Sequence, residues 1–562
     1  MPATPSHPGT SRTRSWWGWG YADAHPDNAE CAAMGALLPG TLARPLPIPR
    51  VADLAIARPG ATPPPALAHL ITADPATRAA HAMGKAYRDV IRALRGRPGR
   101  IPDLVAHPTT HQEVADLLDW AGGHGVAVIP FGGGSSVVGG VEYRGDAHRA
   151  VLSLDLTSMN RVLEIDATSR SARIQAGALG PVLEEQLRPH GLTLRHFPQS
   201  FEFSTLGGWL ATRAGGHYAT VHTHIDDFVQ SLHVVTPAGA STSWRLPASG
   251  AGPSPDRLFL GSEGALGIIT EAWMRLQERP RYKASTSVTF ADFHQALDAV
   301  RAIAQSDLAP ANCRLLDPGE ALLSGASHDG SAVLVLGFES ATAPVDDRLT
   351  SALDLARAHG GRSGAPTADR DTPADTAVRA WRSAFLRMPY LRDGLARMGA
   401  VVETFETAAT WDTLPALIDA VRTQVGAAAL KATGHHQLPS DPRLPRRRRP
   451  LLHRGRRRLP RRRSRNLGRH QSRRGRRPAP PPRHHHPPPR RRPRPPPRLR
   501  PPTPGALRAG TARRQGRPGP PPHPQPGSPG RLTGPQRLPT AVHARARSVV
   551  AWARNSSSAR VW

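Results

Sequence analysis

Val126-Ala-Val-Ile-Pro-Phe-Gly-Gly-Gly-Ser-Ser-Val-Val-Gly-Gly140 is the stretch that decides the fold of this chain. A short apolar run, typical of a buried strand, leads directly into three glycines and two serines. Because glycine has no Cβ, the backbone N–H groups of such a loop stay accessible, and a pyrophosphate can lie against them. An ordinary glycine-rich surface turn is the alternative, and the rest of the sequence decides between the two.

Strands and helices on both sides of the loop indicate an α+β chain. Val114, Leu117 and Leu118 lie on one helical face and predict a helix just before the loop. Before residue 280 the pattern predicts helices at 79–94, 111–122 and 182–187 and strands at 126–129, 151–156, 162–165 and 172–176. After residue 280 it predicts strands at 287–290, 314–316 and 333–338 and helices at 293–304, at 349–358 and from about 411 onward.

The positive charge of the chain is confined to its last part. Residues 441–562 contain 35 arginines, no lysine and one acidic residue, which gives +34 against a total of +31. The first 440 residues therefore carry −3, as an ordinary globular chain does. After about residue 435 Arg, Pro, Gly and His dominate and Phe, Tyr and Met are absent, so we expect this tail to be disordered.

Two origins of the tail are open. An arginine-rich arm would bind nucleic acid. A frame-shifted translation is favoured, because 71 arginines against 3 lysines are typical of GC-rich coding DNA, which yields mainly Arg, Pro, Gly and Ala in the wrong frame. A nucleic-acid partner is therefore disfavoured. No metal site is expected at 484–486, where three histidines lie among prolines with no helix to present them.

Cysteines and the first residues favour the cytoplasm. Cys31 and Cys313 form no disulfide framework and no metal-ligand spacing. Residues 1–20 contain Pro, Ser, Arg and Trp but no apolar core of a signal peptide. No run of the sequence reaches the length of a membrane span. We therefore expect a cytoplasmic protein without a membrane span.

Four segments in order resemble the flavin-binding domain of the vanillyl-alcohol-oxidase superfamily, the PCMH type: PFGGGSS (130–136), QSFEFST (199–205), TRAG (212–215) and EGALGII (263–269). Within this superfamily the pattern most resembles the alkylglycerone-phosphate synthase family and its bacterial relatives. That narrower resemblance rests on RSWWGWG (14–20), CRLLD (313–317) and ETFET (403–407). The resemblance covers about residues 14–430 and does not extend past about 435.

The resemblance implies an FAD cofactor, bound noncovalently because the loop lacks the histidine that covalently flavinylated relatives often carry. The glycine loop would donate to the pyrophosphate, and the other segments would line the rest of the cofactor. The implied cofactor-binding residues are Pro130, Gly132, Gly133, Gly134, Ser135, Ser136, Gln199, Ser204, Thr205, Thr212, Arg213, Gly215, Glu263, Gly264, Gly267 and Ile269. For each serine and threonine a turn-capping role is the alternative.

The resemblance also implies a role for Arg314, which stands where similar enzymes need an arginine for activity. An ion pair within the cap is the alternative. His217, His222 and His224 lie near the flavin motifs, but their spacing does not suit three ligands of one metal, so no metal is expected. The tyrosine and the Ser-His-His-His segment that the family carries later in the chain are not found, and the tail stands in their place.

The activity implied by the resemblance is exchange of acyl for alkyl on dihydroxyacetone phosphate through a flavin adduct. We expect this activity to be impaired, because the later catalytic segments are missing. The partners would be small molecules, a phosphorylated ketone or a lipid-like alcohol, and a homodimer is left open. An FAD-linked 2-hydroxy-acid dehydrogenase or oxidase is one alternative, and a nucleic-acid-binding protein is the other.

The expected fold class is therefore α+β, with a two-subdomain PCMH-type FAD-binding domain at 96–280. An N-terminal extension at 1–95 would precede it, and a truncated α+β cap at 281–434 would follow. The Arg- and Pro-rich tail would occupy 435–562. A cap cut within its sheet would expose an unpaired strand edge.

Overall fold

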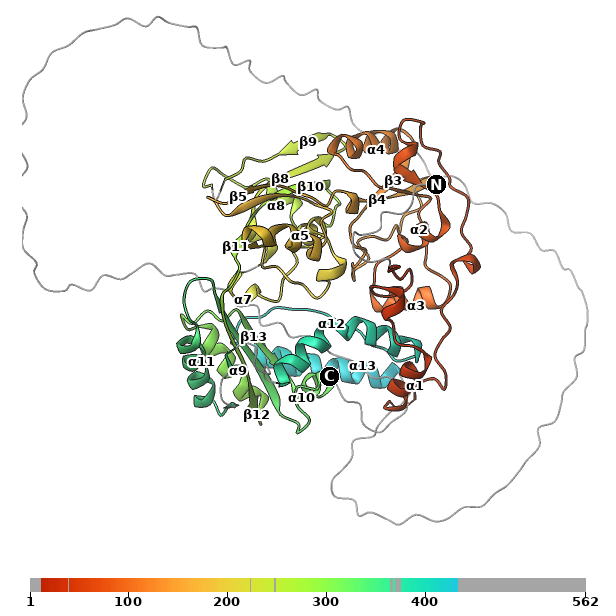
Figure 1. Cartoon of the computed structure of the whole chain (residues 1–562). Coiled ribbons are helices and arrows are strands. Elements are labelled where there is room, and N and C mark those ends of the chain that lie inside the picture. Colours follow the sequence, from red (N-terminus) through yellow and green to blue (C-terminus); the bar gives the residue numbers. More distant parts are fainter. Residues whose placement is uncertain are drawn as a thin grey trace, which may run out of the picture. The chain divides into compact units, whose positions relative to one another are not determined.

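The computed structural model describes residues 12–432, apart from 39, 223, 247–248, 364–366 and 369–375. The tail from residue 435, with every prediction made for it, lies outside these residues. In the described part, two larger sheets precede residue 280 and a third follows it, each with its own helices (Figure 1). The described helices include none that is long and apolar enough to cross a membrane.

The first sheet carries the glycine loop. Its strands lie in the order β1 (Ile71–Thr72), β2 (Leu104–Ala106), β4 (Ala150–Asp155) and β3 (Val126–Phe131). Strands β2, β4 and β3 are parallel, and helix α4 (His111–Gly123) connects β2 to β3. The loop therefore leaves the carboxyl end of a parallel strand, which is where open α/β sheets bind their ligands.

The second sheet is antiparallel. Its strands lie in the order β5 (Val162–Asp166), β6 (Ser171–Gln175), β10 (Ile268–Arg275), β8 (Val229–Thr236) and β9 (Gly239–Thr242). Helices α5 (Gly180–Leu187) and α6 (Leu206–Thr212) supply Leu183 and Trp209 to the core beside it. A separate pair, β7 (Leu192–Thr193) with β11 (Gln277–Glu278), and the short helices α7 (Ala219–His222) and α8 (Asp256–Phe259) complete this part.

The third sheet belongs to the cap. Its strands lie in the order β13 (Asn312–Leu316), β14 (Ala332–Ser340), β12 (Tyr282–Phe290) and β15 (Arg362–Ser363), and β16 (Thr367–Ala368) also pairs with β12. Leu334 and Leu336 of β14 pack in the core with α9 (Phe293–Ala304) and α11 (Asp346–Ala358). The alternate residues Val333 and Val335 pack on the other face, near α10 (Pro318–Ser324). Because both faces are buried, the strand is visible in the sequence as a short continuous apolar run.

The single helix expected over 79–94 is wrong. Two helices occupy this region, α2 (Pro75–Ala80) and α3 (Tyr87–Leu94). Between them the Lys85 N–H donates to Ser136 O at 2.7 Å, across to the glycine loop. A Cβ on Gly84 would lie 2.1 Å from the same oxygen, so the chain passes too close for any other residue. A long-range contact therefore replaces a turn of helix.

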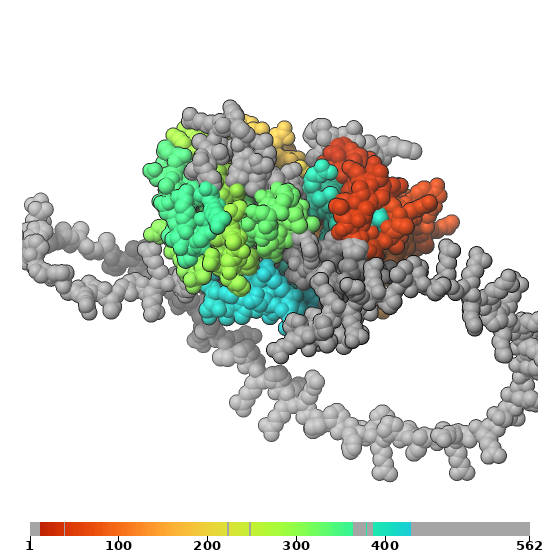
Figure 2. Space-filling model, turned by 90° about the horizontal axis from the view of Figure 1, so that it is seen from below, coloured from red at the N-terminus to blue at the C-terminus, as the bar shows by residue number. Residues whose placement is uncertain are grey.

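Several helices, including α6, α7, α8 and α10, were not predicted, and three longer ones were not predicted or only partly predicted. They are α1 (Asn28–Ala36), α12 (Thr376–Arg397) and α13 (Leu414–Ala432), of which only the last was expected. The buried side of α12 mixes Asp393 and Arg397 with Ala396, which hides its apolar stripe. Trp17 and Val90 pack with Ala396, so the N-terminal residues lie against α12 (Figure 2).

We expect the cap core to be sensitive to truncation at Phe338. Its side chain is fully buried in β14, so Phe338→Ala should lower the free energy of unfolding by about 3–5 kcal/mol. Leu322→Ala is the control, because Leu322 is 41% exposed, and its effect should stay near 0.5 kcal/mol. Urea unfolding followed by circular dichroism measures both, and equal losses would contradict the assigned core.

Candidate cofactor site

The glycine loop lies directly against the 199–205 segment. A Cβ on Gly133 would lie 1.7 Å from Phe203 O, and one on Gly132 would lie 2.3 Å from Thr205 Oγ1. A backbone oxygen cannot move aside as a flexible side chain can, so Gly133 has to remain glycine. Two segments about 70 residues apart in the sequence are thus held in backbone contact.

The other two motifs complete the same site. The Glu263 N–H donates to Ala211 O at 2.8 Å, which joins the 263–269 segment to the end of α6. A Cβ on Gly264 would lie 2.9 Å from Pro130 Cγ, and Gly264 has a φ of +80°. All four motifs therefore meet around one loop, although they are spread over 140 residues of sequence.

The loop offers free hydrogen-bond donors. Within the described residues, the backbone N–H groups of Gly133 through Ser136 donate to no protein acceptor. Gly134 has a φ of +67°, a left-handed conformation that turns successive N–H groups to one side. Unpaired N–H groups in a partly enclosed loop are costly unless a ligand accepts from them. The loop therefore fits the pyrophosphate of a dinucleotide such as FAD.

Two buried polar residues, His81 and Asp155, support the loop through Phe131. The ring of Phe131 lies against Gly134, and His81 packs on that ring with centroids 4.1 Å apart. His81 Nε2 bonds Asp155 Oδ2 at 3.0 Å. Burial alone would raise the pKa of Asp155, but the His81 hydrogen bond and the nearby His81 and His107 charges outweigh it and lower that pKa. The carboxylate therefore stays ionised and holds His81 under the loop.

Two predicted serine and threonine ligands are engaged within the protein. Ser204 Oγ donates to Ser200 O and accepts from Trp209 Nε1 at 2.6 Å. Thr205 Oγ1 accepts from Gly208 N and caps α6. Both side chains are buried, and these contacts are the turn-capping alternative. Their roles toward a cofactor stay predictions.

The remaining predicted residues lie around the same loop. Thr212 Oγ1 donates to Gly208 O at 2.9 Å, and Arg213 ends α6 with a φ of +50° and pairs with Asp226. Gly215 forms a bridge with His224. The Ile269 side chain is buried in the core of the second sheet.

Three more predicted residues, Gly267, Glu263 and Gln199, lie at the edge of the site. A Cβ on Gly267 would lie 2.8 Å from Val234 Cγ1, and Glu263 is exposed beside Gly140. Gln199 lies in the turn that leads to Phe203, next to Ser200. The cofactor-binding roles of these residues stay predictions.

Arg314 lies in the cap rather than at the glycine loop. It stands on β13, and its Nη2 donates to Glu320 Oε1 at 2.5 Å. Its neighbour Asn312 bonds His217 at 2.8 Å between Nδ2 and Nε2, which joins the cap to the flavin motifs. Among the described residues, no group of three His, Cys, Asp or Glu side chains is arranged to hold a metal ion.

Sequence reasoning missed the residues that tie the N-terminal segment to the loop. Lys85 Nζ donates to Trp16 O at 3.0 Å, while its backbone N–H holds Ser136 O. Arg14 Nη2 donates to Gly133 O at 3.0 Å. The signal was present in RSWWGWG (14–20), but nothing in the sequence indicates that this segment lies beside residues 133–136.

Two family models match the chain. The FAD binding domain model matches residues 102–243, and the FAD linked oxidase C-terminal domain model matches residues 279–437. The chain thus contains an FAD-binding domain and an FAD-linked oxidase C-terminal domain, in agreement with the expected placement among vanillyl-alcohol-oxidase-type proteins. The expected PCMH-type fold and the FAD cofactor are therefore confirmed, and the glycine loop is the place that fits the cofactor's pyrophosphate.

Similar proteins include several synthases. The chain is 35% identical over 372 residues to the alkyldihydroxyacetonephosphate synthase of Dictyostelium discoideum, and 31% identical over 364 residues to that of Trypanosoma brucei brucei. These matches span 61% and 60% of this chain but only 59% and 58% of the relatives. A solved alkyldihydroxyacetonephosphate synthase structure aligns with a TM-score of 0.65 at 28% identity, covering 75% of this chain and 84% of that one. These relatives support an FAD-linked enzyme.

We expect Gly133→Ala to abolish FAD binding, because the added methyl would meet the Phe203 carbonyl at 1.7 Å and push the loop away. FAD retention after purification, measured by absorbance near 450 nm, tests this. Gly122→Ala is the matched control, because a Cβ at Gly122 meets nothing within 4 Å and α4 gains a better helix former. Full FAD retention in Gly133→Ala would contradict the assigned contact.

The buried Lys85 ammonium makes stability depend on pH in a definite direction. Burial, reinforced by the charge of Arg14, lowers the pKa of Lys85 from its ordinary 10.5 to about 7. Between pH 7 and 10 the unfolded chain therefore binds more protons at this lysine than the folded chain does, so the free energy of unfolding rises with pH. We expect this rise in the wild type and a flatter profile in Lys85→Met, measured by urea unfolding.

Lys283→Met is the control for this profile, because Lys283 is exposed on β12. Its pH profile should run parallel to that of the wild type. If the Lys85→Met profile also ran parallel, Lys85 would have an ordinary pKa in the folded chain.

Proposed function

We propose that this protein is a flavoenzyme of the alkyldihydroxyacetonephosphate synthase type. It would replace the acyl chain of an acylated dihydroxyacetone phosphate with a long-chain alcohol. The observation that carries this proposal is the extent of the similarity to the synthases, which covers 364–372 residues and so continues from the glycine loop into the cap. A shared FAD domain alone would give a shorter match.

The FAD-binding domain and the cap would have different roles, one binding the cofactor and the other the substrate. The loop at 132–136 would hold the pyrophosphate through its free N–H groups, and the contact with Phe203 would keep the loop in place. FAD, when bound, would supply an electron sink for the exchange. The cap would bind the phosphorylated substrate.

Arg314 is the residue on which substrate binding would depend. Asn312 and Arg314 are two residues apart on β13, so their side chains leave the same face of the strand. Asn312 contacts His217 of the FAD domain on that face. The Arg314 guanidinium, held by Glu320, would bind a phosphate or a carbonyl oxygen of the substrate.

We also propose that the activity is impaired. An exchange of this kind needs a positioned group to move protons, and the family's tyrosine and histidine cluster are not found in the sequence. The last tyrosine of the chain is Tyr390, and the residues after 435 are mainly Arg, Pro and Gly. Weak exchange is therefore the expected result.

The test combines binding with turnover. FAD-loaded protein is mixed with acyl dihydroxyacetone phosphate, and the flavin absorbance spectrum is recorded anaerobically. We expect a saturable spectral change, and slow incorporation of labelled hexadecanol into product. Bleaching by D-lactate or glycolate would instead support a 2-hydroxy-acid dehydrogenase. Rapid, complete exchange would contradict the impairment.

Arg314→Ala tests the substrate site. Loss of a charge-assisted hydrogen bond should weaken the spectral titration with acyl dihydroxyacetone phosphate by about 10- to 100-fold. Arg301→Ala is the control, because Arg301 lies exposed on α9 and pairs only with Asp298 among the described residues. Equal titrations for Arg314→Ala and the control would remove Arg314 from the substrate site.

A further inference from the structure

Arg14 has a guanidinium without a matching carboxylate. Its Nη2 donates to Gly133 O at 3.0 Å, and its Cζ lies 4.6 Å from the centroid of the Phe203 ring. No other acceptor and no ion-pair partner of Arg14 exists among the described residues. Since a guanidinium has five N–H donors, most of them remain free. Arg14 is therefore a cation with donors to spare beside the glycine loop.

The surroundings of Arg14 make this charge costly. Desolvation lowers the pKa of Arg14, although its side chain is exposed to solvent. Lys85 lies close enough for the two charges to repel and to lower the pKa of Lys85. Two cations therefore meet at one side of the loop.

Asp155, the carboxylate whose charge acts on Arg14, is bonded by His81, and the two carboxylates that act on Lys85 are also engaged elsewhere. Asp393 accepts from Trp19 N at 2.6 Å and from Arg392 at 2.8 Å. Asp89 accepts from Ala86 N at 3.2 Å and lies 3.5 Å from Arg88. By contrast, Arg12 in the same segment has its own partner, Asp23, at 2.7 Å. The positive charge at Arg14 is thus left for an anion that the protein does not supply.

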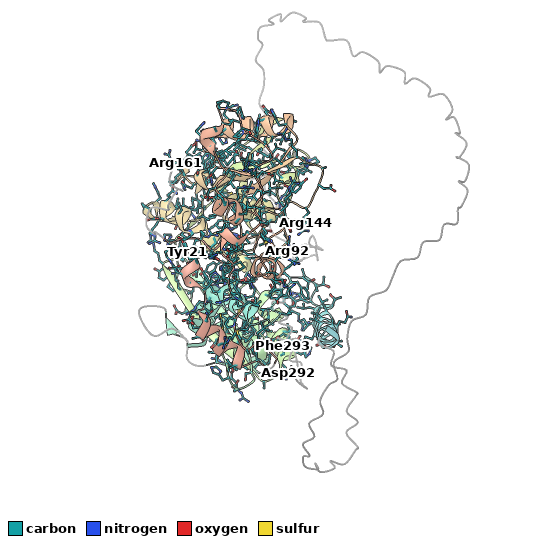
Figure 3. The ribbon with its side chains drawn as sticks, turned by 90° about the vertical axis from the view of Figure 1, so that its right-hand side faces the viewer. Tyr21, Arg92, Arg144, Arg161, Asp292 and Phe293 are labelled. Carbon is teal, nitrogen blue, oxygen red and sulfur yellow. The ribbon has the colours of Figure 1, made fainter. Side chains whose placement is uncertain are left out.

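The segment that carries Arg14 is held firmly. Lys85 Nζ donates to the carbonyls of Ser15 and Trp16, and Ser15 N donates to Gly20 O at 2.8 Å. The backbone N–H of Tyr21, labelled in Figure 3, donates a hydrogen bond to Tyr390 Oη at 3.1 Å. The backbone that carries Arg14 is therefore held in place beside the loop, so less ordering is needed when Arg14 binds a ligand.

We infer that Arg14 binds the pyrophosphate of FAD, so that the N-terminal segment 14–20 is part of the cofactor site. The pyrophosphate is anionic and accepts hydrogen bonds, and the loop beside Arg14 has N–H groups of Gly133–Ser136 that also lack acceptors. Arg14 thus supplies the charge, and the glycine loop supplies the directed donors. This inference rests on FAD binding and not on the proposed synthase activity.

The test compares FAD with riboflavin, which has the same ring and no phosphate. Full-length apoprotein is titrated with each, and quenching of flavin fluorescence gives Kd. Arg14→Gln should weaken FAD binding by about 10- to 100-fold and leave riboflavin binding within about twofold. The Kd for FAD should also become less dependent on salt. Arg12→Gln, two residues away, should change neither Kd.

Every other outcome overturns the inference. Equal weakening of FAD and riboflavin would mean that Arg14 only shapes the loop or contacts the ring. Unchanged FAD binding would mean that Arg14 is free for another anion, such as a phosphorylated substrate. If Arg14→Gln does not fold, Arg14→Lys replaces it, because lysine keeps the charge but lacks the planar, forked donors of the guanidinium. Its Kd for FAD should rise about 3- to 10-fold while riboflavin binding stays unchanged.

Discussion

The close contact between Gly133 and the Phe203 carbonyl is the constraint on which the site depends. There is no room for a side chain at this position, because a Cβ would lie 1.7 Å from the oxygen. The contact joins the parallel sheet, which carries the loop, to the segment that leads into α6 beside the antiparallel sheet. The absence of a side chain at Gly133 therefore lets the two subdomains approach each other closely enough to line one ligand site.

Much of this arrangement could be predicted from local patterns. Helix α4 follows from its apolar spacing and from the capping box formed by Thr110 and Glu113. Strand β14 follows from its short continuous apolar run, which arises because each face packs in a different core. These signals are contained within about ten residues, so no knowledge of distant contacts is needed to recognise them.

Contacts between distant segments could not be predicted in the same way. The break between α2 and α3 exists because Lys85 N–H bonds Ser136 O, about 50 residues away. Helix α12 escaped detection because its buried side includes Asp393 and Arg397, whose partners lie near the N-terminus. Ser204 was expected at the cofactor, but the sequence cannot reveal that Trp209 Nε1 donates to its hydroxyl. Each of these depends on which segments the fold brings together.

The bond from Trp19 N to Asp393 Oδ2 joins residues 374 positions apart. During synthesis at about 5–20 residues per second, the ribosome would need roughly 20–75 s after making Trp19 before it reached Asp393. Until then Trp17 and Trp19, both buried in the finished protein, have no α12 to pack against. The residues made first are thus among the last to settle, and a chaperone that shields the nascent N-terminus should raise the yield of folded protein.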